Sequence, residues 1–250
     1  MPSRRLPNSM PAVIRTLTKA RDTYALTPVP ADRAITAAQF AQLDGASPAN
    51  LLPRLLKEAH DVDLAQAAQA PLTTELAQTA ALLTMTVSHF HQVLDLGIAR
   101  GTFAAGTRSY YGRDVHATTI PDLSSYDDVL AAATAVGDGE NDRQTAEGAG
   151  FTPMALPAAS EVATLGDVFR TLRGGVQIAE TNTDTQCEQA MALYPAAQAL
   201  AVDLCDTVEF FYRHDPDASS RRAKCERWGV VYIPDAAPPA PPAPPAPPVP

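Results

Sequence analysis

Hydrophobic residues recur at helical spacing along most of the chain. The clearest series begins near Pro71 and ends at Gly101, and its apolar members follow one another at intervals of three or four: Leu76, Ala80, Leu83, Val87, Phe90, Leu94 and Ile98. Residues at such intervals share one face of a helix. The pattern predicts a long helix that buries one side, as a helix of a bundle does.

Shorter series with the same spacing predict further helices before and after it. Their expected starts carry prolines or side chains that cap helix N-termini: Pro11, Thr36, Ser47, Ser125, Ser160 and Asp184. Gly45 ends one of these helices, and the pair Gly174–Gly175 weakens another. Short β-branched alternations are almost absent, with the segment Trp228–Pro234 as the exception. We therefore predict an all-α helical bundle.

The last long helix can be overlaid on the first. A displacement of 117 residues places Leu76, Ala80, Leu83, Val87 and Leu94 on Leu193, Ala197, Leu200, Leu204 and Phe211. The overlay suggests an internal repeat with halves 11–115 and 120–235, each a unit of three or four helices. Ordinary helix periodicity explains the same overlay, so the repeat and a single helical domain over 11–235 both stay open.

The two ends of the chain differ in composition from the helical part. Residues 1–10 are expected to be a flexible N-terminus. Residues 236–250 form a proline-rich tail or linker, which reads PPAPPAPPAPPVP from Pro238. Such a segment favours polyproline II, and it serves either as a stiff spacer or, through its PxxP spacing, as a ligand for an aromatic-lined groove. No Arg or Lys flanks it to fix an orientation of binding, which favours the spacer.

Acidic residues outnumber basic ones, 28 against 19, and the net charge is −9. Specific nucleic-acid binding is disfavoured, because phosphate recognition needs a basic surface. The basic side of the first helix, with Arg15, Lys19 and Arg21, leaves binding to an anionic surface as an alternative. Neither an apolar run of about 18 residues nor a signal-peptide pattern occurs, so we expect a cytoplasmic protein without a membrane span.

Histidines are the first candidates for metal chemistry. His89 and His91 lie about 200° apart around a helix, so they cannot share one metal ion. A site built by His60, His89 or His91, and His116 from separate helices would suit a metal-dependent helical-bundle hydrolase, and this enzyme is the alternative function. Structural histidines are favoured, and Asp95 is placed to pair with His91 four residues away.

Other signs of catalysis are missing. The chain has no GxSxG, GxxxxGK[ST] or GxGxxG, so it offers no nucleophile elbow and no phosphate-binding loop. The acidic stretch Asp138–Asp142 does not fit a calcium loop. Cys187, Cys205 and Cys225 form no CxxC pair, which argues against a disulfide scaffold or a thiolate zinc site. No cofactor is predicted.

Aromatic residues near arginines follow both long helices. The candidates for contact with a partner are Tyr110, Tyr111, Arg227, Trp228 and Tyr232. Tyr, Trp and Arg dominate the energetics of protein interfaces. The competing interpretation is that these aromatic rings cap the ends of the bundle and pack inward.

The long helix followed by RWGVVY resembles uncharacterised bacterial helical proteins that end in a similar WGVVY element. The likeness covers about the last fifth of the helical part, and it implies no activity. We therefore predict a non-catalytic structural or protein-interaction module with a polyproline spacer. Its expected partner is a protein, and self-association is included.

Overall fold

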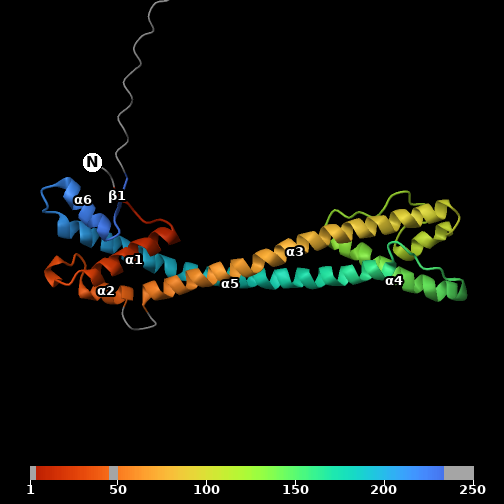
Figure 1. The fold of residues 1–250 in the computed structure, drawn as a ribbon, viewed down its shortest axis with the longest axis horizontal. Coiled ribbons are helices and arrows are strands. Elements are labelled where there is room, and N and C mark those ends of the chain that lie inside the picture. Colours follow the sequence, from red (N-terminus) through yellow and green to blue (C-terminus); the bar gives the residue numbers. More distant parts are fainter. Residues whose placement is uncertain (1–3, 45–49, 234–250) are drawn as a thin grey trace, which may run out of the picture. The chain divides into compact units, whose positions relative to one another are not determined.

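The computed structural model describes residues 4–44 and 50–233. The α-helices are α1 (Met10–Leu26), α2 (Ala37–Asp44), α3 (Leu51–Ala99), α4 (Tyr126–Glu147), α5 (Ala159–Tyr212) and α6 (Ala218–Arg227). Short 3-10 helices are η1 (Pro30–Asp32), η2 (Ala105–Tyr111) and η3 (Gly148–Gly150), and the strands are β1 (Arg4–Arg5) and β2 (Val231–Tyr232). The predicted all-α fold is confirmed (Figure 1). The predicted tail over 236–250 lies outside the described residues.

The two long helices are longer than the sequence pattern predicts. Helix α3 continues through Pro71 and joins two helices that we expected to be separate. Proline removes one backbone hydrogen bond from a helix. Ala65 before Pro71 and Leu76 after it are both buried, and this packing stabilises the helix where the hydrogen bond is missing. Helix α5 likewise continues through Gly174–Gly175, because Phe169 and Val176 are buried on both sides of the glycines.

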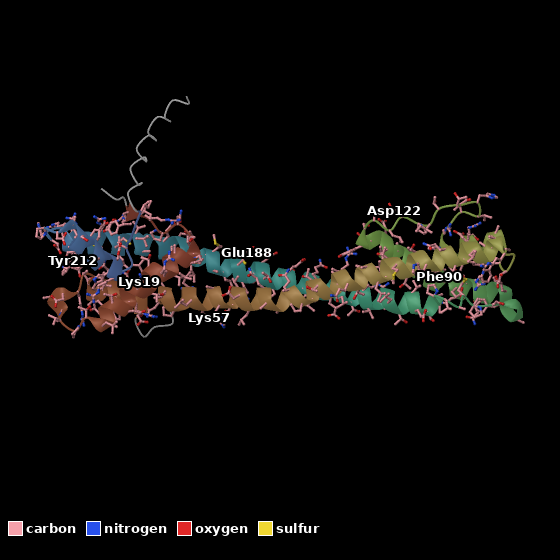
Figure 2. The ribbon with its side chains drawn as sticks, turned by 45° about the horizontal axis from the view of Figure 1, so that its top comes forward. Lys19, Lys57, Phe90, Asp122, Glu188 and Tyr212 are labelled. Carbon is pink, nitrogen blue, oxygen red and sulfur yellow. The ribbon has the colours of Figure 1, made fainter. Side chains whose placement is uncertain are left out.

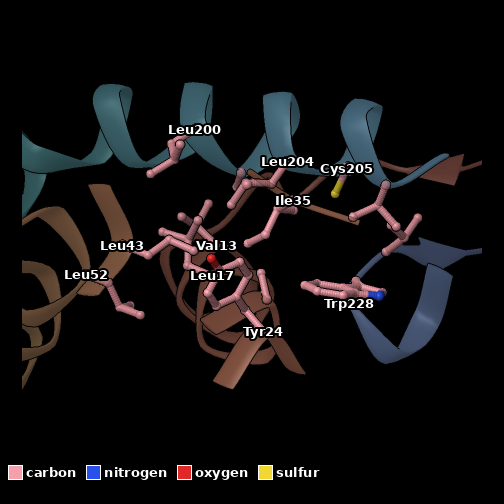
Figure 3. Close-up of a cluster of buried hydrophobic side chains, with 14 of the residues drawn as sticks. Val13, Leu17, Tyr24, Ile35, Leu43, Leu52, Leu200, Leu204, Cys205 and Trp228 are labelled. Atoms are coloured by element: carbon pink, nitrogen blue, oxygen red, sulfur yellow. The ribbon is translucent and has the colours of Figure 1, made fainter. Parts of the chain in front are cut away.

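The chain divides into two compact units, and each boundary falls inside a long helix. Unit 1 comprises residues 1–61 and 186–250, and unit 2 comprises residues 62–185. The core of unit 1 gathers side chains from α1, α2, the start of α3, the end of α5 and α6. Figure 3 shows part of this core, in which Leu204 and Cys205 of α5 lie near Ile35 and Trp228.

The N-terminal segment is tied into unit 1. Strand β1 pairs antiparallel with β2, so that Arg4 lies opposite Tyr232 and Arg5 lies opposite Val231. The Arg4 guanidinium also binds the carboxylates of Asp206 and Glu209 on α5. The structure thus places β1 and the start of α1 within the range 1–10, and the flexibility predicted for that range stays a prediction. The strand expected in the WGVVY segment is confirmed, but its partner was not foreseen.

Unit 2 packs the second part of α3 against η2, α4 and the first part of α5. Its core takes one face from each helix and includes Leu76, Ala80, Leu83, Val87, Phe90 and Leu94 from α3, Val129, Ala133 and Val136 from α4, and Val162, Phe169 and Val176 from α5. Phe90 is labelled in Figure 2. The expected cap of α4 is confirmed, because the Ser125 hydroxyl accepts a hydrogen bond from the Asp128 amide at 3.2 Å.

The two units do not coincide with the halves 11–115 and 120–235, since each unit takes helices from both halves. The overlay by 117 residues also places buried Leu94 on Phe211, which is 41% exposed. A displacement of 114 residues matches burial better. It places Leu83, Val87, Phe90, His91 and Leu94 on Ala197, Ala201, Leu204, Cys205 and Val208, all of them buried. The internal repeat stays a prediction. If it exists, the displacement of 114 residues aligns the buried positions of the two long helices better than 117 does.

Two glycines give a matched test of the packing in unit 2. A Cβ on Gly139 of α4 would overlap the carbonyl oxygen of Tyr110 and lie 2.7 Å from its carbonyl carbon, whereas a Cβ on Gly175 of α5 would meet nothing within 4 Å. We expect Gly139→Ala to destabilise the protein by at least about 2 kcal/mol, because η2 must move. Gly175→Ala should stabilise it by about 1 kcal/mol through helix propensity. Urea denaturation followed by circular dichroism measures both, and equal effects would contradict the close approach of η2 to α4.

Candidate functional site

The two most prominent aromatic candidates lie in the cores. Tyr111 is 1% exposed and Trp228 is 3% exposed. The Tyr111 hydroxyl donates a hydrogen bond to Glu140, and the Trp228 indole N–H donates one to the Tyr212 hydroxyl at 3.1 Å. Tyr111 and Trp228 therefore pack inward, as the second of the two interpretations of the aromatic residues expects. As folded, neither side chain can touch a partner.

The other three candidates are more accessible but do not form one surface. Tyr110 is half-buried against the core of unit 2. In unit 1, the side chain of Arg227 is exposed, and Tyr232 is half-buried with its hydroxyl donating to Glu209 at 2.8 Å. Burial, together with Cys225 and Glu209, raises the pKa of Tyr232. The five candidate residues therefore belong to two separate units.

His91 is fully buried on α3, and neither of its ring nitrogens has a hydrogen-bond partner among the described residues. Its ring packs edge-on against Phe90. Burial and, to a smaller extent, the positive charge of Arg113 lower the pKa of His91 against the opposing charge of Asp95, and the resulting pKa is about 4. The expected pair of His91 with Asp95 does not form, because two arginines occupy the Asp95 carboxylate.

Those arginines hold the segment after α3 against the helix. Arg108 Nε donates to Asp95 Oδ1 at 2.8 Å, and Arg113 binds both Asp95 oxygens at 3.0 Å. Arg113 also donates to the Thr119 carbonyl at 2.7 Å. Burial alone would raise the pKa of Asp95, but the hydrogen bonds from Arg113 and Arg108 bring it below its usual value. This network is structural.

A second polar network lies inside unit 2. The Arg143 guanidinium is fully buried and donates to Glu140 Oε2 at 3.0 Å and to the Thr152 carbonyl at 2.7 Å. The other oxygen of Glu140 accepts from the Met154 amide at 3.0 Å. Burial and the Glu140 carboxylate raise the pKa of Tyr111. A groove of about 600 Å³ between α4 and α5 reaches Glu140, but the carboxylate is already committed to internal partners.

The histidines proposed for a metal site do not come together. His60 is an exposed residue of unit 1, whereas His89, His91 and His116 belong to unit 2. In unit 2, His91 is buried and the other two are exposed. Among the residues that the structure describes, no three His, Cys, Asp or Glu side chains are grouped to hold a metal ion. The arrangement therefore gives the hydrolase alternative no support.

Comparison with known proteins adds nothing to this picture. No family model, curated protein or solved structure matches the chain. The resemblance to bacterial proteins with a WGVVY element stays a prediction. Within the described ranges, no helix is long and apolar enough to cross a membrane.

The first candidate for a partner-binding surface is an apolar row on α3 in unit 2. We call it the α3 face, and it consists of five exposed side chains: Leu82, Met85, His89, Val93 and Leu96. The row lies on the side of α3 away from the buried series. A groove beside its second half is also lined by Leu156, which is 77% exposed, and by Glu161.

The second surface is a groove of about 600 Å³ in unit 1, which we call the aromatic groove. It lies between the end of α5 and the segment before α2, and its lining includes Tyr24, Ile35, Phe210 and Phe211. Arg33 and Arg213 supply its charged groups, and its polar groups include those of His214, Thr36 and Thr207. No carboxylate is among the described residues that line it. Neither surface was predicted from the sequence.

The basic side of α1 was the third candidate. Arg15 and Lys19 are exposed, while Arg21 forms an ion pair with Asp22 at 2.8 Å. Two exposed basic side chains on one helix are a weak attraction for an anionic surface. This alternative stays a prediction.

Proposed function

We propose that this protein is a non-catalytic protein-interaction module whose contact surface is the α3 face. The supporting observation is the second, exposed apolar row on a helix that already buries its first row. Leu82, Met85, His89, Val93 and Leu96 follow one another at intervals of three or four. That spacing presents one continuous stripe, which a second helix can pack against.

The absence of charge on this part of α3 supports the same proposal. Between Glu75 and Asp95 the sequence contains no Asp, Glu, Lys or Arg. Exposed helix faces are ordinarily rich in charged residues. When a partner displaces water from a face without charge, no unpaired charge is buried, and the large desolvation cost of such a charge is avoided.

The partner that we propose is a second copy of the same chain. Each copy carries a net charge of −9, so two copies repel one another over most of their surface. The five side chains of the α3 face include no carboxylate, and Glu161 is the one acidic residue among the described residues that line the adjoining groove, so this repulsion is weaker there. Most homodimers have a two-fold axis, and the same surface of each copy then contacts that surface of the other copy. The α3 face of one copy would pack against the α3 face of the second copy in this way.

A pair of matched variants tests this proposal. Met85→Lys places one ammonium group in the α3 face, and Ile178→Lys places one on an exposed position of α5 in the same unit. Sedimentation velocity over a dilution series compares their association with that of the unaltered chain. We expect Met85→Lys to weaken association at least about tenfold, since a buried unpaired charge costs more than 1.4 kcal/mol.

Ile178→Lys should associate as the unaltered chain does. If both lysine variants associate equally well, the α3 face is not the contact surface. Circular dichroism on both variants shows whether they keep the helical content of the unaltered chain, so that a loss of folding is not mistaken for a loss of contact.

A further inference from the structure

We infer that the proline-rich segment of this chain, residues 238–250, docks in the aromatic groove of unit 1. This inference concerns a different surface from the α3 face and does not depend on self-association. It gives the PxxP segment a binding site within its own chain, whereas the sequence alone favours a role as a spacer.

The groove has the side chains that recognise polyproline segments. Phe210 and Phe211 are neighbours on α5, and both are exposed, Phe210 by 66%. The Arg213 guanidinium lies over the Phe210 ring at 3.4 Å from its centre, and Arg33 lies over the Tyr24 ring at 4.3 Å. Aromatic rings in a groove are the usual surface on which polyproline II segments dock.

The hydrogen-bonding groups of groove and segment are complementary. A proline has no backbone N–H, so a proline-rich segment presents mainly carbonyl acceptors to its binding site. Arginine side chains are donors only. Arg33 and Arg213 supply such donors, and the described lining contributes no carboxylate that would be left without a partner. A segment rich in N–H groups or in lysine would not match this groove.

The segment is long enough to reach the groove. Strand β2 holds Tyr232 against Glu209, which directly precedes Phe210 on α5, so the described chain ends within the same unit as the groove. From Pro234 to Pro250 the sequence has seventeen more residues. At about 3.1 Å per residue they extend roughly 50 Å, more than the ~30 Å diameter of a small domain.

Attachment to the same chain favours this segment over a separate ligand. A tethered ligand reaches an effective concentration in the millimolar range when its linker spans the distance. A docked segment of modest intrinsic affinity is therefore bound for most of the time. The experiment distinguishes this arrangement from two others, in which the groove binds the proline-rich segment of a second copy or stays empty.

Fluorine NMR of the full chain labelled with 4-fluorophenylalanine tests the inference. The chain has seven phenylalanines, and the signals of Phe210 and Phe211 are assigned with Phe210→Leu and Phe211→Leu. The comparison chain has the same length, with the prolines of 238–250 replaced alternately by glycine and serine. Phe90 and Phe169, which are buried in unit 2, serve as internal controls.

We expect the replacement to shift the signals of Phe210 and Phe211 and to leave those of Phe90 and Phe169 unchanged. A synthetic peptide PPAPPAPPAPPVP, added to the replaced chain, should restore the original shifts in a saturable manner. Unchanged Phe210 and Phe211 signals on replacement would overturn the inference. Shifts that appear in the unaltered chain only at high protein concentration would overturn it in favour of docking between two copies.

Discussion

Replacing Arg143 by methionine is expected to destabilise the protein by about 3–5 kcal/mol. The guanidinium is fully buried and holds the Glu140 carboxylate and the Thr152 carbonyl. Methionine removes these donors and leaves the buried Glu140 carboxylate with only uncharged partners among the described residues, the Tyr111 hydroxyl and the Met154 amide. A buried charge that loses its counter-charge costs far more than the packing that methionine restores.

Urea denaturation followed by far-UV circular dichroism measures this effect. The matched control is Arg170→Met, which removes an arginine from an exposed ion pair with Asp167 in the same unit. The control should change stability by less than about 1 kcal/mol, because exposed ion pairs contribute little. The double variant Arg143→Met with Glu140→Met should recover much of the loss, since no buried charge remains. A loss below about 1 kcal/mol for Arg143→Met would show that the buried network is not important for stability.

Acidification from pH 6.5 to pH 4 is expected to remove about 3 kcal/mol of stability through His91 alone. Burial, with the help of Arg113, lowers the pKa of His91 to about 4, whereas an unfolded chain has the ordinary value of 6.5. As the pH falls, the unfolded chain therefore takes up the proton first. The contribution is complete above about pH 6.5, declines through the window and is lost below about pH 4.

The variant His91→Leu should lose this pH dependence. It also removes two ring nitrogens that have no partner among the described residues, so we expect it to be at least as stable as the unaltered chain at pH 7. His116→Leu, at an exposed position of the same unit, should keep the original pH profile. Urea denaturation at several pH values between 4 and 7 provides the measurement. An unchanged decline in His91→Leu would mean that other groups cause it.

Apolar periodicity was sufficient to find the helices, because each long helix buries one continuous row of side chains. It was not sufficient to find their limits. Pro71 and the pair Gly174–Gly175 are local signals against a helix, and packing on both sides of them outweighs about 1–3 kcal/mol of unfavourable propensity. Long-range pairing, such as that of β1 with β2, leaves no local trace in the sequence.

The candidate surface was harder to predict, because aromatic residues near arginines occur both at interfaces and in cores. From the sequence, Tyr111 resembles a residue that contacts a partner. In the structure, its hydroxyl and the buried Arg143 guanidinium both donate hydrogen bonds to Glu140, so Tyr111 is part of the core. The signal that would have found the α3 face lies in the same helix. Leu82, Met85, Val93 and Leu96 form a second series of helical spacing, displaced from the buried one, and the sequence between Glu75 and Asp95 contains no charged residue.

Sedimentation equilibrium of the unaltered chain tests the central claim most directly, namely that the protein is an interaction module that pairs through an uncharged helix face. One chain has a mass of 26.4 kDa. We expect the measured mass to approach twice this value as the concentration rises and to fall toward the single-chain mass on dilution. Adding salt should strengthen the association slightly, because it screens the repulsion between two acidic copies. A mass of one chain at every concentration and salt condition would contradict the proposal.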